Sequence, residues 1–524
     1  MRRVKKKRIK RSGTVSLLIL LGALFLYLLL QLNAVLSSYS SKEFWDIVDL
    51  GLSSVFSITI LAAVVIVILE NKEPVKATAW ILVLVLLPVV GIICYIFFGR
   101  NFRKERLFSR KELHDQERLD QLTHQQQSSL PLESSIQDRS MSSKLRTMIL
   151  LLNNNKALLT QKNRTRLLTA GETAFERIFD AIRNARHHIH LESYIINEDS
   201  TGKALRDLLI HKAREGVETR VIYDDVGSWS LSRDFLHTLQ KAGVRIRPFL
   251  PVRFPLLASQ LNYRNHRKVL VIDGGLAFSG GMNIADKYRF EDPVLGPWQD
   301  VHLELEGEAV KSLQAVFSID WFFVEGERLE GSPYFNPPRV DEDKWVQVVT
   351  SGPDSEYASI MEAYFSAIVN AREKILIANP YFIPNESIFT ALKTAAMSGV
   401  EVHLIIPGVT DSWITKAAGN SFIGELLDAG VHVHEYWNGF IHSKVMTVDD
   451  AFVSIGSANL DHRSFNQNFE VNTLIYDHEQ AIEVRQMLES DLENSHEIDP
   501  VRFSERPFSK KFQESVIRLF SPLL

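Results

Sequence analysis

The sequence contains only one cysteine in 524 residues. That residue, Cys94, lies inside an apolar run, so the chain has neither a disulfide framework nor a cysteine-based zinc site. An excess of positive charge is also missing, because the formal net charge is −4 at pH 7. General nucleic-acid binders usually carry a basic excess. The charge balance therefore argues against that class of protein.

Clusters of metal ligands are scarce as well. His187, His188 and His190 stand close together, but the matching place in the second half of the chain, residues 373–376, has no histidine. We therefore interpret the three histidines as the start of a strand. No metal ion and no other cofactor is expected.

Three long apolar runs occupy the first hundred residues: 15–36, 50–69 and 77–98. Each approaches or reaches the ~20 residues that cross a bilayer core. The first run follows a basic N-terminus and has two interpretations, a cleaved signal peptide or an uncleaved anchor; its length favours the anchor. The other two predict a transmembrane hairpin. We expect a multi-pass protein of the cell membrane, anchored by residues 1–99.

Beyond the anchor the chain repeats itself. Residues 100–160 are interpreted as a polar juxtamembrane spacer, since Gln, Ser and charged residues dominate most of them. Ala181–Arg186 then matches Ala367–Arg372, and a strand-like run follows each. Strands that alternate with helices predict an α/β fold. The duplication predicts two α/β domains, 161–340 and 341–500, packed with pseudo-two-fold symmetry.

The final segment, 501–524, has an amphipathic pattern. Apolar residues fall at helical spacing with basic residues nearby: Phe512, Val516, Leu519, Phe520 and Leu523, beside Lys510, Lys511 and Arg518. Such a helix can lie on a membrane or dock its apolar face on the protein itself. The sequence leaves both alternatives open.

The most informative pattern is a six-residue motif that occurs twice at identical spacing. The first copy is His266, Lys268, Asp273, Gly280, Gly281 and Asn283, and the second is His442, Lys444, Asp449, Gly456, Ser457 and Asn459. A single short motif matches by chance. Two copies with equal spacing are a strong signal.

These residue types suit an attack on a phosphodiester. The ester is an anion that repels nucleophiles, so a catalyst first has to neutralise it, and lysine charges and asparagine amides can do so. One histidine can then act as nucleophile and the other as general acid. A His and a Lys two positions apart on a strand point the same way, toward one phosphate.

The remaining motif positions have supporting roles. Asp273 and Asp449 come at a turn, where we expect them to hold a hairpin. Gly281 and Ser457 have little bulk, which would let the backbone and the following asparagine approach a phosphate oxygen closely.

Two carboxylates outside the motif, Glu470 and Asp300, are candidates to orient the histidines. Each could accept a hydrogen bond from an imidazole Nδ1–H and so fix the tautomer. Alternatively, Asp300 is an ordinary surface carboxylate.

The paired motifs resemble those of the phospholipase D superfamily, in which two similar halves form one active site. A closer resemblance, to the bacterial cardiolipin synthases, runs from about Glu70 to the C-terminus. It rests on Asn262-Tyr-Arg-Asn-His-Arg-Lys268, Trp298-Gln-Asp300-Val-His302, Leu460-Asp-His-Arg-Ser-Phe465 and Asn468-Phe-Glu470. The resemblance implies transmembrane helices followed by two phospholipase D-like domains, and it favours Glu470 as an orienting carboxylate.

The implied function is a membrane-bound phosphatidyltransferase. Two phosphatidylglycerol molecules would give cardiolipin and glycerol through a phosphatidyl-histidine intermediate, with His266 as nucleophile and His442 as acid and then base. Phosphatidylglycerol and other membrane lipids are the expected partners, and nucleic acid is not. A phosphatidylserine synthase, a hydrolytic phospholipase D, a nuclease and a non-catalytic scaffold are the alternatives.

The side of the membrane is ambiguous. Basic residues cluster in 1–11 and in 100–111, and the positive-inside rule assigns both clusters to the cytoplasm. Three spans would place them on opposite sides. The resemblance favours the hairpin as the anchor, which implies a cytoplasmic catalytic part.

Overall fold

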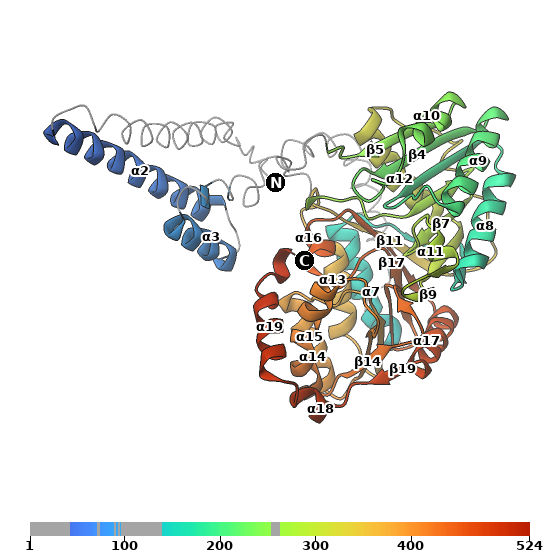
Figure 1. Ribbon diagram of the computed structural model, residues 1–524. Coiled ribbons are helices and arrows are strands. Elements are labelled where there is room, and N and C mark those ends of the chain that lie inside the picture. The colour runs from blue at the N-terminus through green and yellow to red at the C-terminus, as the bar shows by residue number, and fades with distance from the viewer. Residues whose placement is uncertain are drawn as a thin grey trace, which may run out of the picture. The chain divides into compact units, whose positions relative to one another are not determined.

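The computed structural model describes residues 42–70, 74–87, 91–92, 95, 139–252 and 262–523. The chain divides into two compact units: one contains the described N-terminal residues up to 95, and the other contains 139–252 and 262–523 (Figure 1).

Two helices make up most of the described part of the N-terminal unit: α2 (Lys42–Glu70) and α3 (Pro74–Leu86). They pack on each other through a small apolar cluster. Among the described residues, one segment, Asp49–Leu69, is long and apolar enough to cross a membrane, and the apolar part of α3, Ala77–Leu86, is shorter. The described residues thus contain one candidate span where the apolar runs predict three. The first predicted run, 15–36, lies outside them.

The larger unit is built on two mixed β-sheets. The seven-stranded sheet contains, in spatial order, β2 (Asn163–Leu168), β10 (His302–Gly307), β7 (Leu276–Gly280), β6 (Val269–Ile272), β3 (His188–Ser193), β4 (Glu218–Asp224) and β5 (Arg245–Phe249). The nine-stranded sheet contains β1 (Leu159–Thr160), β11 (Trp345–Ser351), β18 (Glu470–Tyr476), β17 (Phe452–Gly456), β16 (Val445–Val448), β12 (Lys374–Ala378), β13 (Glu401–Pro407), β14 (His432–Tyr436) and β19 (Ser495–Glu497).

The two sheets share one topology. The strands β3, β4 and β5 run parallel, as do β12, β13 and β14. In both sheets an antiparallel hairpin, β6–β7 or β16–β17, pairs with the first of these strands. Seven consecutive strands therefore have the same order in each half. Each copy of the repeated sequence therefore forms one sheet of this order.

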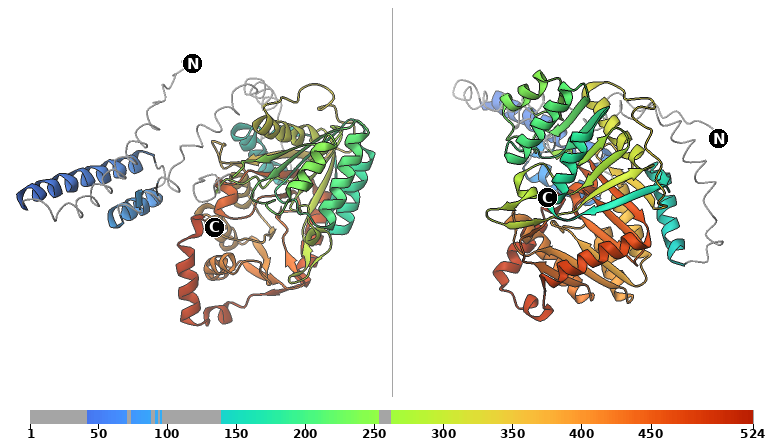
Figure 2. Two further views of the ribbon diagram at one scale, coloured as in Figure 1. Left: turned by 45° about the horizontal axis from the view of Figure 1, so that its top comes forward. Right: turned by 90° about the vertical axis from the view of Figure 1, so that its right-hand side faces the viewer.

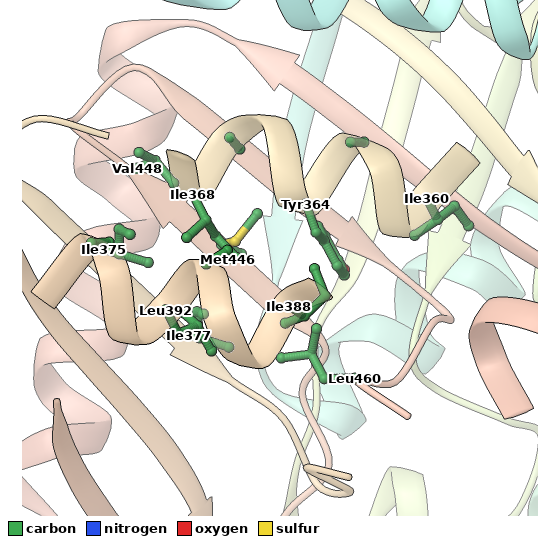
Figure 3. Close-up of a cluster of buried hydrophobic side chains, with 14 of the residues drawn as sticks. Ile360, Tyr364, Ile368, Ile375, Ile377, Ile388, Leu392, Met446, Val448 and Leu460 are labelled. Carbon is green, nitrogen blue, oxygen red and sulfur yellow. The ribbon is translucent and has the colours of Figure 1, made fainter. Parts of the chain in front are cut away.

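Helices cover the outer face of each sheet. In the first half these are α8 (Gly171–Asn184), α9 (Ser200–Arg214) and α10 (Arg233–Lys241), and in the second half α13 (Ser359–Val369), α14 (Glu386–Met397) and α15 (Trp413–Asp428). Figure 3 shows how α13 and α14 pack Ile360, Ile368 and Leu392 on the sheet. Between the sheets, α12 (Val310–Glu325) and α17 (His478–Glu493) join apolar side chains of both sheets in a third core.

The predicted spacer of residues 100–160 differs from the structure at its C-terminal end. Residues 139–154 form α7 (Arg139–Asn154), which buries Leu145, Met148 and Leu151 in the core of the second half. Strand β1 follows and pairs with β11. Composition indicates a spacer here because it does not show which face of a helix is apolar.

Candidate active site

The two motif histidines lie where the halves meet. His266 precedes β6 and His442 precedes β16. The backbone N–H of His266 donates to the carbonyl of Phe469, 2.9 Å away, and that of His442 donates to the carbonyl of Gln299, 2.7 Å away. Each histidine is thus fixed by a main-chain bond to the opposite half of the chain.

The residue after each of these carbonyls is a buried carboxylate. Glu470 Oε2 accepts from His266 Nδ1 at 3.0 Å, and Asp300 Oδ2 accepts from His442 Nδ1 at 2.6 Å. Glu470 is 0 % exposed and Asp300 1 %, so Asp300 is not a surface carboxylate. With Nδ1 occupied, Nε2 is the ring nitrogen that remains for chemistry. Each histidine thus pairs with a carboxylate of the other half, which the spacing along the sequence did not indicate.

Gly281 and Ser457 contact the carboxylates in the structure. A Cβ on Gly281 would lie 2.0 Å from Asp300 Oδ1, so the absence of a side chain makes room for this carboxylate. The Ser457 hydroxyl donates to Glu470 Oε2 at 2.5 Å. Both small residues therefore lie against the carboxylates that pair with the histidines. That they also let a phosphate approach stays a prediction.

Each motif lysine lies beside its own histidine. Lys444 Nζ is 2.9 Å from His442 Nδ1 and 3.1 Å from Nε2. Lys268 Nζ donates to the His266 carbonyl at 2.6 Å. Burial lowers the pKa of Lys268 to about 7 and that of Lys444 to about 8. A bound anion would favour the charged form of both.

The two motif asparagines differ in their contacts. Asn283 Oδ1 accepts from the backbone N–H of Ile195 at 3.1 Å, and its Nδ2 donates to the Tyr288 hydroxyl at 2.7 Å. Asn459 is 5 % exposed, and its Oδ1 has no hydrogen-bond partner. A phosphate oxygen would have to accept from the Nδ2 group of this amide, because Oδ1 is itself an acceptor.

The motif aspartates lie away from the histidines and hold the strands, as their place at a turn suggested. Asp273 accepts from the backbone N–H groups of Arg186, His187 and His188. Asp449 accepts from the equivalent groups of residues 372–374 in the second half. Both aspartates tie the β-hairpin to the start of the first parallel strand.

Burial and neighbouring charges act differently on the two histidine pairs. Burial lowers the pKa of His266, and Glu470 opposes that shift. Burial and the Lys444 charge lower the pKa of His442 further below its ordinary value. Burial raises the pKa of Asp300 to about 6. Burial acts the same way on Glu470, but His266 and Lys268 outweigh it and bring its pKa below the ordinary value.

Sequence reasoning missed the aromatic lining of the site. The Tyr194 ring lies 4.9 Å from the His266 ring, and Trp298 lies 5.0 Å from His442. Tyr381, 6.4 Å from His442, donates its hydroxyl to Asp411 at 2.5 Å. One signal was present in the sequence: Tyr194 and Tyr381 both closely follow the first parallel strand of their repeats.

Two exposed tryptophans stand in equivalent loops of the two halves. Trp229, between β4 and α10, is 61 % exposed, and Trp413, which begins α15 after β13, is 62 % exposed. The first loop contacts Tyr194 through the Ser228 hydroxyl, and the second contacts Tyr381 through Asp411. Both loops therefore border the residues that touch the histidines.

The clustered histidines of the first half belong to the fold. His190 lies in β3, stacks on Phe317 at 4.5 Å and contacts Gln314 Oε1 at 3.0 Å. His188 packs against Tyr334.

Comparison with protein families finds a match to the model described as "Cardiolipin synthase, PLD-like domain" over residues 178–292 and 364–492. Residues 57–100 match the model described as "Phospholipase_D-nuclease N-terminal". The first match contains both motifs, and the second begins within α2.

Individual proteins resemble the chain over most of its length. A "Cardiolipin synthase 2" of Bacillus anthracis is 42% identical over 461 residues, covering 88% of this chain and 89% of the relative. A "Cardiolipin synthase" of Geobacillus kaustophilus is 43% identical over 488 residues, covering 92% and 96%. Among solved structures, the phosphatidylserine synthase of Haemophilus influenzae has the same fold, with a TM-score of 0.55, 15% identity, and coverage of 74% of this chain and 100% of that one.

Proposed function

The chain belongs to the cardiolipin synthases with phospholipase D-like domains, and from this we propose how its paired histidines make cardiolipin. The protein is a phosphatidyltransferase that acts on phospholipids and associates with a membrane. Phosphatidylglycerol is the substrate, and cardiolipin and glycerol are the products. Nucleic acid has no place in this reaction.

One observation supports the proposal above others: each histidine has a buried carboxylate of the opposite half on Nδ1. Such a partner holds the Nδ1 proton of the ring, and it stabilises the positive charge that forms on His266 when Nε2 bonds to phosphorus and on His442 when Nε2 carries the proton to be donated. Neither half alone has the complete arrangement. We therefore assign one composite site to the two motifs.

In the first step, His266 Nε2 attacks the phosphorus of phosphatidylglycerol. The phosphorus–oxygen bond to the glycerol headgroup breaks, and His442 gives that oxygen a proton, so glycerol leaves. The product on the enzyme is a phosphatidyl group bonded to His266. The assignment is supported by Glu470, because a pKa below the ordinary value keeps this carboxylate charged beside the new cation.

In the second step, His442 takes the proton from a headgroup hydroxyl of another phosphatidylglycerol. The resulting oxygen attacks phosphorus, the bond to His266 breaks, and cardiolipin is released. The phosphorus–nitrogen bond conserves the energy of the first ester, so no nucleotide is required. His442 is protonated when glycerol leaves and neutral when the second lipid arrives, which its partner Asp300 accommodates.

The lysines and asparagines bind the phosphate. Lys268 and Lys444 are buried beside the histidines and gain a counter-ion when the anionic phosphodiester enters. The Nδ2 group of Asn459 can donate to a phosphate oxygen, and Asn283 retains one amide hydrogen beside its bond to Tyr288. These four side chains would neutralise the ester before the attack.

For the membrane we propose a hairpin of the apolar runs 50–69 and 77–98 with the catalytic halves in the cytoplasm. The helix α2 and the basic cluster of residues 100–111 support this orientation.

The test uses the full-length enzyme in vesicles that contain phosphatidylglycerol labelled in its terminal glycerol. Cardiolipin and free glycerol should appear in equal amounts. Added serine should give no phosphatidylserine, and water should give little phosphatidic acid. Phosphatidylserine as the main product, or glycerol without cardiolipin, would contradict the proposed acceptor.

A further inference from the structure

The C-terminal helix α19 (Phe508–Arg518) docks on the protein through Ile517 and through polar side chains. Its one carboxylate, Glu514, is 3 % exposed and pairs with Arg506 at 2.9 Å. Asn420 of α15 donates to the same carboxylate at 3.3 Å. Arg518 donates to the Ser421 carbonyl at 3.1 Å and lies over the ring of Phe422.

Five large apolar residues of this segment are exposed, whereas Ile517 packs against the core of the second half. The exposed fractions of the five are 80 % for Phe508, 59 % for Phe512, 39 % for Val516, 77 % for Leu519 and 54 % for Phe520. Intervals of four, four, three and one residues place them on one helical face. A surface helix of a water-soluble domain normally buries such a face. The prediction that the apolar face docks on the protein therefore does not hold for Phe512, Val516, Leu519 and Phe520.

The charged side chain that borders this apolar face, here called the α19 face, is Lys511: at about 3.6 residues per turn it lies about 60° around the helix from Phe508, whereas Lys510 lies about 160° from Phe512. Lys510 and Lys511 are exposed, and no outward-facing residue of α19 is acidic, because Glu514 is turned inward. Basic side chains next to large apolar ones are typical of a helix that lies in the headgroup region of an anionic bilayer. If a second copy of this chain covered the α19 face, basic residues beside the face would not be required.

The α19 face also leads to the candidate active site. After α19 the chain forms the short 3₁₀ helix η5 (Ser521–Leu523), which contacts α16 (His462–Asn466). Gln467 donates to the Pro522 carbonyl at 3.4 Å. Helix α16 begins three residues after Asn459, and Figure 1 shows α19 running beside α15 to the C-terminus next to α16.

We propose that α19 lies in the surface of an anionic phospholipid bilayer. Phe508, Phe512 and Leu519 insert among the acyl chains near the headgroups, and Lys511 at the border of the face contacts a lipid phosphate. The contact holds the α16 end of the site at the lipid surface. It rests on the proposed function only in requiring a lipid substrate, and its main test below does not depend on turnover.

The position of α19 can be measured in the full-length enzyme reconstituted in nanodiscs with phosphatidylglycerol. Cys94 is the only native cysteine, so a C94S background permits one fluorophore at a time. The probe is attached at Phe512→Cys and, as control, at Glu479→Cys, an exposed position of α17. Quenching is then compared for iodide in water and for a nitroxide on the lipid acyl chain.

The proposal predicts that the nitroxide quenches the probe at position 512 and that iodide quenches it several-fold less than the probe at position 479. Equal quenching of both probes by iodide would overturn the proposal. Protection of position 512 from both quenchers would also overturn it, because the face would then be covered by protein, either a second copy or another segment.

A kinetic test uses the triple variant Phe508→Ser, Phe512→Ser and Leu519→Ser. Its apparent KM for phosphatidylglycerol in vesicles should rise about tenfold or more, since apolar burial in the bilayer is lost. Its activity on short-chain phosphatidylglycerol dispersed in detergent should stay within about twofold. Met397→Ser with Val369→Ser removes other exposed apolar residues and should change neither. An equal loss in vesicles and in detergent would refute a membrane role.

Discussion

Glu470→Gln removes the charge that the proposed mechanism places behind the nucleophile. In the attack on phosphorus, the His266 imidazole changes from neutral to cationic, 3.0 Å from Glu470 Oε2. With an effective dielectric constant of about 20, Coulomb's law gives about 5 kcal/mol for a full charge at this distance. Only part of that charge exists in the transition state, and loss of one preorganised group typically costs about 10²- to 10³-fold in kcat. We expect a loss of that size.

The assay follows single turnovers with phosphorus-labelled phosphatidylglycerol. Formation of the labelled enzyme should slow by the stated factor in Glu470→Gln, whereas lipid binding should change little, since the lysines remain. Glu497→Gln is a matched control, because Glu497 also accepts from a histidine Nδ1, that of His432 at 2.7 Å, but on the exposed edge of the second sheet. A loss below about tenfold in Glu470→Gln would refute the assigned role, as would an equal loss in the control.

Three further predictions follow from the same geometry. The value of kcat/KM should fall as the pH rises through about 7 to 8, where Lys268 and Lys444 lose the protons that attract phosphate. It should also fall as the pH drops through about 6, where Asp300 gains a proton. A flat profile between pH 5 and 9 would contradict these roles. Gly281→Ala should lower kcat about 10²-fold or more, because its Cβ would meet Asp300 Oδ1 at 2.0 Å and displace it from His442, and a normal kcat with unchanged melting temperature would be inconsistent with the contact. Turnover should survive EDTA when the ionic strength is held constant, and a specific divalent ion that restores lost activity would count against a site built on lysine and histidine.

The sequence predicted the repeated α/β fold and the histidine–lysine pairs because both depend on local order along the chain. Equal spacing in the two copies sets the same hairpin in each half, so the place of Asp273 and Asp449 at the turn could be inferred from strand periodicity. The pairing of Glu470 with His266 could not be inferred in this way. It depends on how the halves dock, through main-chain bonds such as that from His266 to Phe469.

Composition was a weaker guide where a polar segment has one buried face. Helix α7 falls in the predicted spacer, although Leu145 and Met148 are buried in the core of the second half. For α19 the pattern was recognised, but its orientation depends on the buried pair of Glu514 and Arg506. Tertiary contacts decide which side of such a helix faces the protein.

The covalent intermediate is the central claim, and trapping it tests the claim most directly. Full-length enzyme is mixed with phosphatidylglycerol, quenched under alkaline conditions that preserve phosphorus–nitrogen bonds, digested and examined by mass spectrometry. The account predicts a phosphatidyl adduct on His266, accumulating in His442→Ala with a substrate that has a good leaving group and absent in His266→Ala. An adduct on His442 in the intact enzyme would reverse the two roles, and no adduct on either histidine would contradict the covalent mechanism.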